Sequence, residues 1–219
     1  MDALRAIGWT IGKEVRIELR KGYALGGLIV FVLCTVYVIY LTVSEVPPAL
    51  WNALYWVAFL FLSIHTVLKS FAHESSSRYL YYYTLMAPET LFAAKCIYNA
   101  GLLTALGLLM YGALSLIGGH PVVNTGLFIT AIVAGGIGIS LCFTLISGIA
   151  IKSDNGATLM TVLSFPVIIP VLLNLVRLSE ASLQRPGTVQ VGDHLLMLGA
   201  IDLLLVALGL LLFPYLWRS

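Results

Sequence analysis

Long apolar runs alternate with short polar breaks along most of the chain. Six of these runs are long enough, at about 1.5 Å per helical residue, to cross a hydrocarbon core of roughly 30 Å. The predicted spans are Tyr23–Val43, Leu50–Leu68, Ile97–Ile117, Gly126–Ile151, Ala157–Val176 and Leu195–Trp217. Neither a sequence repeat nor a domain boundary interrupts the series. The pattern therefore predicts an all-α membrane protein with a single transmembrane domain, residues 1–219.

The segment before the first span, residues 1–22, instead has apolar residues at every third or fourth position. This period predicts an amphipathic helix. Because basic residues lie among its polar positions, we expect the helix to lie in the membrane interface with its apolar stripe at the acyl boundary. The alternative is a helix packed on another protein domain. The stripe consists of Leu4, Ile7, Ile11, Val15 and Leu19.

The composition is that of a membrane protein, and the distribution of charge predicts its orientation in the membrane. Hydrophobic residues make up 60% of the chain and charged residues only 10%, against about a quarter in soluble domains. With the N-terminus inside, the inner segments hold ten Lys and Arg residues, and the outer segments hold only Arg177 and Arg185. This positive-inside bias predicts that both termini are cytoplasmic. The basic residues flank membrane spans, so they give no indication of nucleic-acid binding.

Aromatic and sulfur side chains near the spans have simple interpretations. The aromatic residues at the start of the second span, Trp51, Tyr55 and Trp56, are expected to anchor its outer end at the interface. The cysteines lack a CxxC spacing and lie in or beside apolar runs, which predicts buried thiols and neither a disulfide nor a metal site. These cysteines are Cys34, Cys96 and Cys142.

The longest polar break on the predicted cytoplasmic side is the stretch Lys69–Lys95. It carries several charges, which a bilayer core accommodates only at high cost, and four tyrosines within five positions, Tyr79 to Tyr83. Two interpretations are open. The stretch is either a short interfacial helix that a soluble partner binds, or a loop on the headgroups whose tyrosines belong to the aromatic belt.

The fifth span contains two prolines near its middle, Pro166 and Pro170, and Asn174 continues their stripe. Each proline removes a backbone donor and clashes with the preceding turn, which predicts a broken helix. Helices broken near the midplane are common where substrates pass or where helical bundles rock. A static kink that only shapes packing is an equal alternative.

The fourth span carries small residues on one face. Gly136, Ser140, Thr144 and Gly148 recur at a spacing of four. Small side chains let helix backbones approach closely in a membrane. The stripe therefore predicts a helix-packing face.

Three polar residues at or near the outer ends of spans are further candidates. Asp202 lies inside the last span, and an intramembrane carboxylate suggests a functional site unless water reaches it. His120 and His194 fall at outer ends of spans, where a neutral imidazole could ligate iron, although two solvated loop histidines are the simpler interpretation.

The chain lacks the motifs of an enzyme. It contains no GxxxxGK phosphate loop, no HExxH and no GxSxG, and no paired intramembrane acids suggest a proton relay. No catalytic set and no metal site can be assembled from its residues. Any nucleotide hydrolysis would therefore belong to a different subunit.

Several segments resemble the cytochrome c maturation haem exporter B (CcmB) family of ABC-2-type permeases. Phe71–Glu74 with Arg78–Leu80 is similar to the family's acidic segment, and Leu85–Pro88 with Ala94–Lys95 to its Leu-rich helix with Pro and closing Ala-Lys. Phe165–Leu172 is similar to its Pro-x-x-x-Pro signature. The basic interfacial helix, the six spans and the length also match. One departure is Arg78, where family members often have Gly.

The resemblance implies a permease subunit of the bacterial inner membrane, present in two copies and driven by a separate ABC ATPase. It also implies a haem-handling membrane partner and a periplasmic haem chaperone. No cofactor is assigned to this chain directly, and haem is a candidate cofactor of the complex. The resemblance assigns ATPase coupling to Phe71, Glu74, Arg78, Leu80, Tyr81 and Tyr82.

Two other functions are open. One is an ABC-2 permease that exports a lipid, a polysaccharide or a drug. The other is a membrane assembly scaffold that transports nothing.

Overall fold

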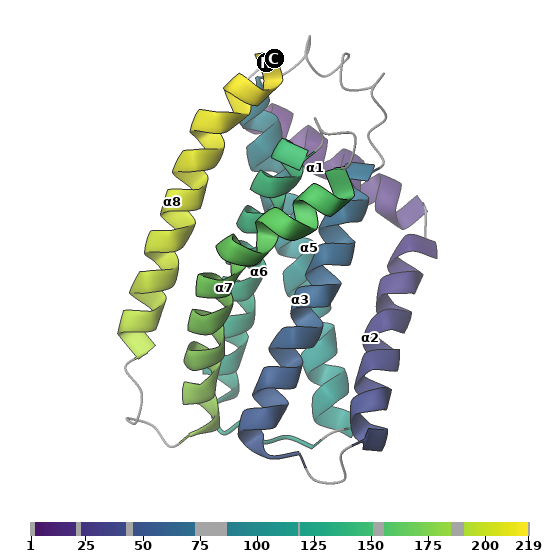
Figure 1. The fold of residues 1–219 in the computed structure, drawn as a ribbon. Helices are drawn as coiled ribbons and strands as arrows, with labels where there is room; N and C mark the ends of the chain where they lie inside the picture. Colours follow the sequence, from purple (N-terminus) through teal and green to yellow (C-terminus); the bar gives the residue numbers. More distant parts are fainter. Residues whose placement is uncertain are drawn as a thin grey trace.

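The computed structural model describes residues 3–20, 23–42, 46–72, 87–117, 119–150, 156–184 and 191–218. Within these residues every regular element is an α-helix. Figure 1 shows α1 lying obliquely across one end of a bundle of long helices, with both chain termini at that end. The helices are α1 (Ala3–Arg20), α2 (Tyr23–Thr42), α3 (Pro48–Ala72), α5 (Pro88–Ile117), α6 (Thr125–Ala150), α7 (Gly156–Leu183) and α8 (Val191–Arg218).

Most of the long helices could cross a membrane. Five of them have the necessary length and apolar composition within the described residues. The apolar part of α2, Gly26–Leu41, is shorter. The described chain is therefore that of an all-helical membrane protein. The five candidate spans are Pro48–Val67, Glu89–Ile117, Thr125–Ala150, Val162–Leu183 and Val191–Pro214.

Local signals set several helix starts. Asn124 caps α6, because its Oδ1 accepts a hydrogen bond from the Leu127 backbone N–H at 3.1 Å. At the start of α5, Pro88 occupies a position where its missing N–H costs nothing, and Glu89 places a negative charge in the first turn. These signals fix where α5 and α6 begin relative to their neighbours.

The central helix of the bundle is α6, which packs against α3, α5, α7 and α8. Glycines allow this close packing. A Cβ atom at Gly135 of α6 would lie 2.7 Å from the Trp56 ring of α3, and one at Gly107 of α5 would lie 2.8 Å from the Phe59 ring. Large aromatic side chains of α3 therefore fit where its neighbours have no side chain.

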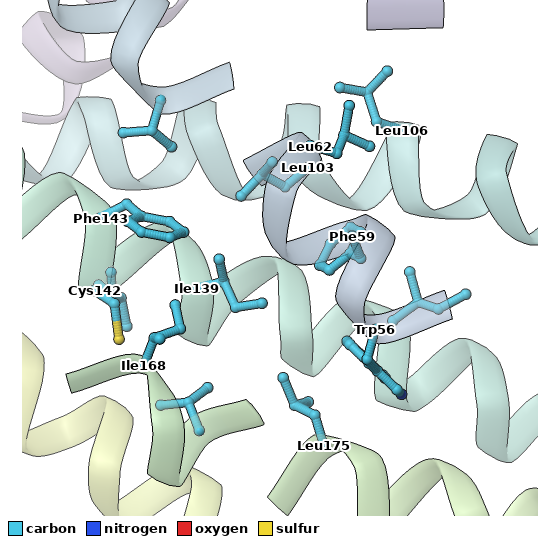
Figure 2. Close-up of a cluster of buried hydrophobic side chains, with 14 of the residues drawn as sticks. Trp56, Phe59, Leu62, Leu103, Leu106, Ile139, Cys142, Phe143, Ile168 and Leu175 are labelled. Atoms are coloured by element: carbon cyan, nitrogen blue, oxygen red, sulfur yellow. The ribbon is translucent and has the colours of Figure 1, made fainter. Parts of the chain in front are cut away.

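The core lies where α3, α5, α6 and α7 meet. Figure 2 shows Trp56 and Phe59 of α3 converging with Leu103 of α5, Ile139 of α6 and Leu175 of α7. Each of these side chains is fully buried. Burial of so much apolar and aromatic surface holds the four helices in one arrangement, through close packing of their side chains.

The prediction that aromatic residues anchor the outer end of the second span at the membrane interface is wrong. Trp51, Tyr55 and Trp56 are buried inside the bundle, with at most 1% of each side chain exposed. The Tyr55 hydroxyl donates a hydrogen bond to the Gly107 carbonyl at 3.1 Å, so its polar tip is satisfied by protein and not by headgroups. The ring of Trp51 also packs edge-on against Phe128 of α6.

Two helix ends lie well beyond the ends of the expected spans. α5 begins at Pro88 instead of Ile97, because Leu91, Phe92 and Ala94 pack inward and extend the helix through Lys95. α7 continues past Val176 to Leu183. Its last turns are held by the segment before α6, where the backbone N–H groups of Val123 and Asn124 donate to the Ser182 carbonyl.

The prediction of three buried thiols is correct for two of them. Cys96 and Cys142 are buried, and Cys34 is exposed on α2. Cys34 lies on the outward side of that helix, beside the exposed Leu33. All three are free cysteines.

Candidate functional site

The helix with two internal prolines is bent. Pro166 and Pro170 both lie inside α7, and Figure 1 shows the axis of α7 changing direction partway along the helix. Both prolines face outward from the bundle. Since each proline removes a backbone donor, the ladder of hydrogen bonds is interrupted there, which is the ordinary cause of such a bend.

Asn174 connects the region after the bend to α8. Its Nδ2 donates to the Pro170 carbonyl at 2.8 Å, one turn earlier in α7. This leaves its Oδ1 as an acceptor, and His194 Nδ1 of α8 lies 3.2 Å away. The predicted stripe of Pro166, Pro170 and Asn174 thus has two outward prolines and one buried amide that joins α7 to α8.

A buried polar network joins the same part of α7 to α3. Trp56 Nε1 donates to Ser179 Oγ at 2.7 Å, and Asn52 Nδ2 donates to the Val176 carbonyl at 3.0 Å. Asn52 Oδ1 also lies 2.7 Å from Ser179 Oγ. Sequence reasoning missed this network, because Asn52 lies among aromatic residues and Ser179 in a stretch expected to be an outer loop.

The small-residue stripe of α6 meets two different helices. A Cβ at Gly136 would lie 3.2 Å from the Ala100 carbonyl of α5. Ser140 Oγ donates to the Cys96 carbonyl at 2.9 Å, and Thr144 Oγ1 accepts from Asn99 Nδ2 at 3.0 Å. At Gly148, a Cβ would lie 2.5 Å from the Phe213 ring of α8 instead.

Asp202 of α8 lies against α6. A Cβ at Gly138 would be 2.9 Å from Asp202 Oδ1, and the same position faces Val171 of α7 at 3.2 Å. Among the described residues, Asp202 Oδ1 is buried and has no hydrogen-bond partner. Cys142 is an electrostatic neighbour of this carboxylate. The residue is therefore part of a helix contact as well as a polar group in an apolar span.

The burial of Lys95 is a further feature that the sequence does not predict. Lys95 is one of the basic residues expected to flank the membrane, and only 1% of its surface is exposed. The available signal was its spacing of four from Asn99, which puts both on the face of α5 that meets α6. Asn99 Oδ1 is likewise buried without a partner in the described chain.

An apolar groove of about 480 Å³ lies between α5, α6 and α8. Phe92, Cys96 and Ala100 of α5 line one side, and Val206 and Leu210 of α8 line another. The groove offers almost no polar atoms, so it suits hydrocarbon and not a charged solute.

The two outer histidines have protein partners. His120 Nε2 lies 3.1 Å from the Tyr111 hydroxyl, and His194 is bonded to Asn174 as described above. Within the described chain, no group of three or more His, Cys, Asp or Glu residues could hold a metal ion.

Most of the residues expected to contact an ATPase lie outside the part of the chain that the structure describes. Phe71 falls in the last turn of α3. The remaining five, Glu74, Arg78, Leu80, Tyr81 and Tyr82, lie outside the described residues.

Comparison with protein families matches residues 5–215 to the family described as CcmB protein. The chain belongs to the CcmB family. The match spans nearly the whole chain and confirms the resemblance drawn from its motifs. Comparison with curated proteins and with solved structures finds no match.

Membership of the CcmB family gives the architecture a context. CcmB proteins are permease subunits of ABC transporters in cytochrome c biogenesis and haem transport, located in the bacterial inner membrane. The five long apolar helices fit a multi-pass protein of that membrane. The bent α7 and the buried networks around it are thus features of a permease bundle.

Proposed function

We propose that the chain is the membrane subunit of an ABC transporter complex that exports haem or releases the haem-loaded chaperone during cytochrome c maturation. A separate ATPase subunit drives it. The family match over residues 5–215 carries this proposal. In the complex, a second permease copy, a haem-handling membrane protein and a periplasmic haem chaperone are the expected partners.

The proposed topology has six spans and both termini in the cytoplasm. The 20 residues of α2 give about 30 Å of helix, enough for a sixth span beside the five long ones. Both chain termini lie at one end of the bundle, as an even number of crossings requires (Figure 1). The excess of Lys and Arg in the segments at that end supports its cytoplasmic placement.

The proposed coupling runs from the ATPase through α3 to α7. The segment Phe71–Leu85, which follows α3, is the ATPase contact, with Glu74 and Arg78 as ionic residues. A displacement of this segment moves α3, because the two are continuous in the chain. The hydrogen bonds from Asn52 and Trp56 then carry the part of α7 beyond Pro170 along with α3. The proline bend serves as the hinge between the two halves of α7.

Affinity purification of the full-length chain from its native membrane, with identification of the bound subunits, tests the proposal. The expected result is an ABC ATPase together with cytochrome c maturation proteins. Recovery of an ATPase with lipid, polysaccharide or drug export proteins would support the other permease function. A chain that recruits no ATPase and stimulates none would be an assembly scaffold.

A further inference from the structure

Two arginines and two glutamates of α1 lie on different sides of the helix. Ala6 and Thr10 are buried where α1 packs against α5. Glu14 and Glu18 are electrostatic neighbours of Tyr98 on α5, so they lie toward the bundle. At about 100° per residue, Arg16 and Arg20 fall on a different side of the helix from Glu14 and Glu18. Both arginines are exposed.

A hollow of about 330 Å³ runs along this basic side of α1. Trp9, Lys13, Arg16 and Arg20 line it, and Gly12 leaves its floor open. Trp9 is 63% exposed, which is unusual for so large an apolar side chain. Nothing lies within 4 Å of the position that a Cβ at Gly12 would take. The hollow is therefore bordered by cations and by one exposed indole.

The positive charge of the hollow is only partly balanced. Lys13 Nζ lies 3.1 Å from Glu14 Oε1, so that lysine is paired with an acid. For the portion of the chain that the structure covers, neither Arg16 nor Arg20 takes part in an ion pair. A guanidinium presents several donors in a planar fork, which matches the oxygens of a phosphate group.

We propose that this side of α1 binds the phosphate of an anionic phospholipid in the adjacent membrane leaflet. The positive charge of the hollow favours a phosphate group as the ligand. The position of α1 beside the first span favours a lipid as the molecule that carries this phosphate. Two residues separate α1 from α2, and α1 crosses the end of the bundle obliquely (Figure 1). Tryptophan is enriched at membrane interfaces, and anionic lipids attract basic residues near the surface. The lining residues of the site all belong to α1, and the proposal does not depend on the transported substrate.

Native mass spectrometry of the full-length chain in detergent tests the site. The probe is phosphatidylglycerol, compared with phosphatidylcholine of the same acyl chains and with glycerol phosphate as a soluble phosphate. In the variant with Arg16→Gln and Arg20→Gln, phosphatidylglycerol binding should fall about 30-fold, from about fivefold per arginine. The matched charge removal Arg177→Gln, at an exposed position of α7, should leave binding unchanged.

A charge-preserving variant tests whether misfolding explains a loss of lipid binding in the glutamine variant. Arg16→Lys with Arg20→Lys should bind phosphatidylglycerol better than the glutamine variant and less well than the native chain, because charge is kept and the planar fork is lost. Equal binding by the native and glutamine chains would overturn the proposal. So would equal binding of the two lipids, or glycerol phosphate binding as tight as that of the lipid. Loss of an acidic protein partner in the glutamine chain with lipid binding intact would assign the surface to that protein instead.

Discussion

Trp56 Nε1 donates a hydrogen bond to Ser179 Oγ across 2.7 Å, and both residues are buried. The bond joins α3, which leads to the proposed coupling segment, to the part of α7 that follows both prolines. It is surrounded by aromatic rings, since Trp56 packs edge-on against Tyr55 and Phe59. A hydrogen-bonded connection between α3 and α7 therefore lies on the side of the bend that follows both prolines.

Replacing Trp56 by Phe tests the strength of this connection. The change keeps an aromatic ring but removes the indole donor, and it leaves space beside Gly135. We expect the free energy of unfolding to fall by about 1–3 kcal/mol, from one lost hydrogen bond and a small cavity. Thermal unfolding of the purified protein in detergent measures the effect. Trp9→Phe at an exposed position is the control and should change stability little; equal effects of the two changes would contradict the structure.

Glycine substitutions test the contact between α5 and α6. At Gly136 a methyl group would press on the Ala100 carbonyl and the Thr104 side chain, so Gly136→Ala should destabilise the protein by about 1–3 kcal/mol. Gly112→Ala in α5 has open space around it and should be neutral or stabilising by up to about 1 kcal/mol. Unfolding in denaturant compares the two. A stable Gly136→Ala protein would mean that α6 does not pack this closely against α5.

Straightening α7 tests the hinge. Pro166→Ala with Pro170→Ala restores two backbone donors, and we expect normal protein levels in the membrane but loss of cytochrome c maturation. Cytochrome c content of cells, normalised to permease level, is the measurement. Pro214→Ala, close to the end of α8, is the matched control and should retain activity. Native cytochrome c levels in the double variant would reduce the bend to a packing feature.

Charge reversal tests the coupling segment. Glu74→Lys places a cation where an ATPase would meet an anion, and breaking a desolvated charge pair costs about 2–5 kcal/mol. Retention of the ATPase during purification should then fall about 30-fold or more. Tyr81→Ala with Tyr82→Ala should also weaken retention, since tyrosine is a frequent interface anchor. Glu180→Lys, near the opposite end of the bundle, is the control. Full retention by both test variants would end the assignment of this segment as the ATPase contact.

Cysteine labelling from outside the cell tests the proposed topology. Gln184 is exposed just after the end of α7 and serves as the outer reporter position, whereas the nearby Ser182 is fully buried. With native cysteines removed, Gln184→Cys should react with a membrane-impermeant reagent and Ser76→Cys should not. Reaction at Ser76 in intact cells would reverse the orientation.

The sequence predicts the helical class well, because long apolar runs and a period of 3.6 are local signals. It fails where polar residues are satisfied by distant ones. The pattern puts Lys95 among the flanking charges and Ser179 in an outer polar stretch, but only the fold shows that Lys95 is buried and that Ser179 bonds to Trp56 of α3. No local pattern shows that Trp56 points inward, since interfacial and core aromatics have the same composition.

For the candidate site, the sequence predicts which side of a helix a residue lies on, but not which helix it contacts. A spacing of four puts Gly136, Ser140, Thr144 and Gly148 on one side of α6, but it does not show that Gly148 meets α8 while the other three meet α5. Likewise, the prolines predict a bend in α7, but only the fold shows that Asn174 is hydrogen-bonded to His194.

The central position of α6 has a consequence for how the protein is made. Helices α3 and α5 are synthesised before α6, and α7 and α8 after it, yet α6 packs against all four. When α6 first enters the bilayer, Gly138 and Gly148 have no Asp202 and no Phe213 to face, because α8 does not yet exist. The small-residue side of α6 that later packs against α8 is therefore exposed to lipid until α8 has been translated. Truncation of the gene before Val191 would leave that face permanently uncovered and open to membrane quality-control proteases.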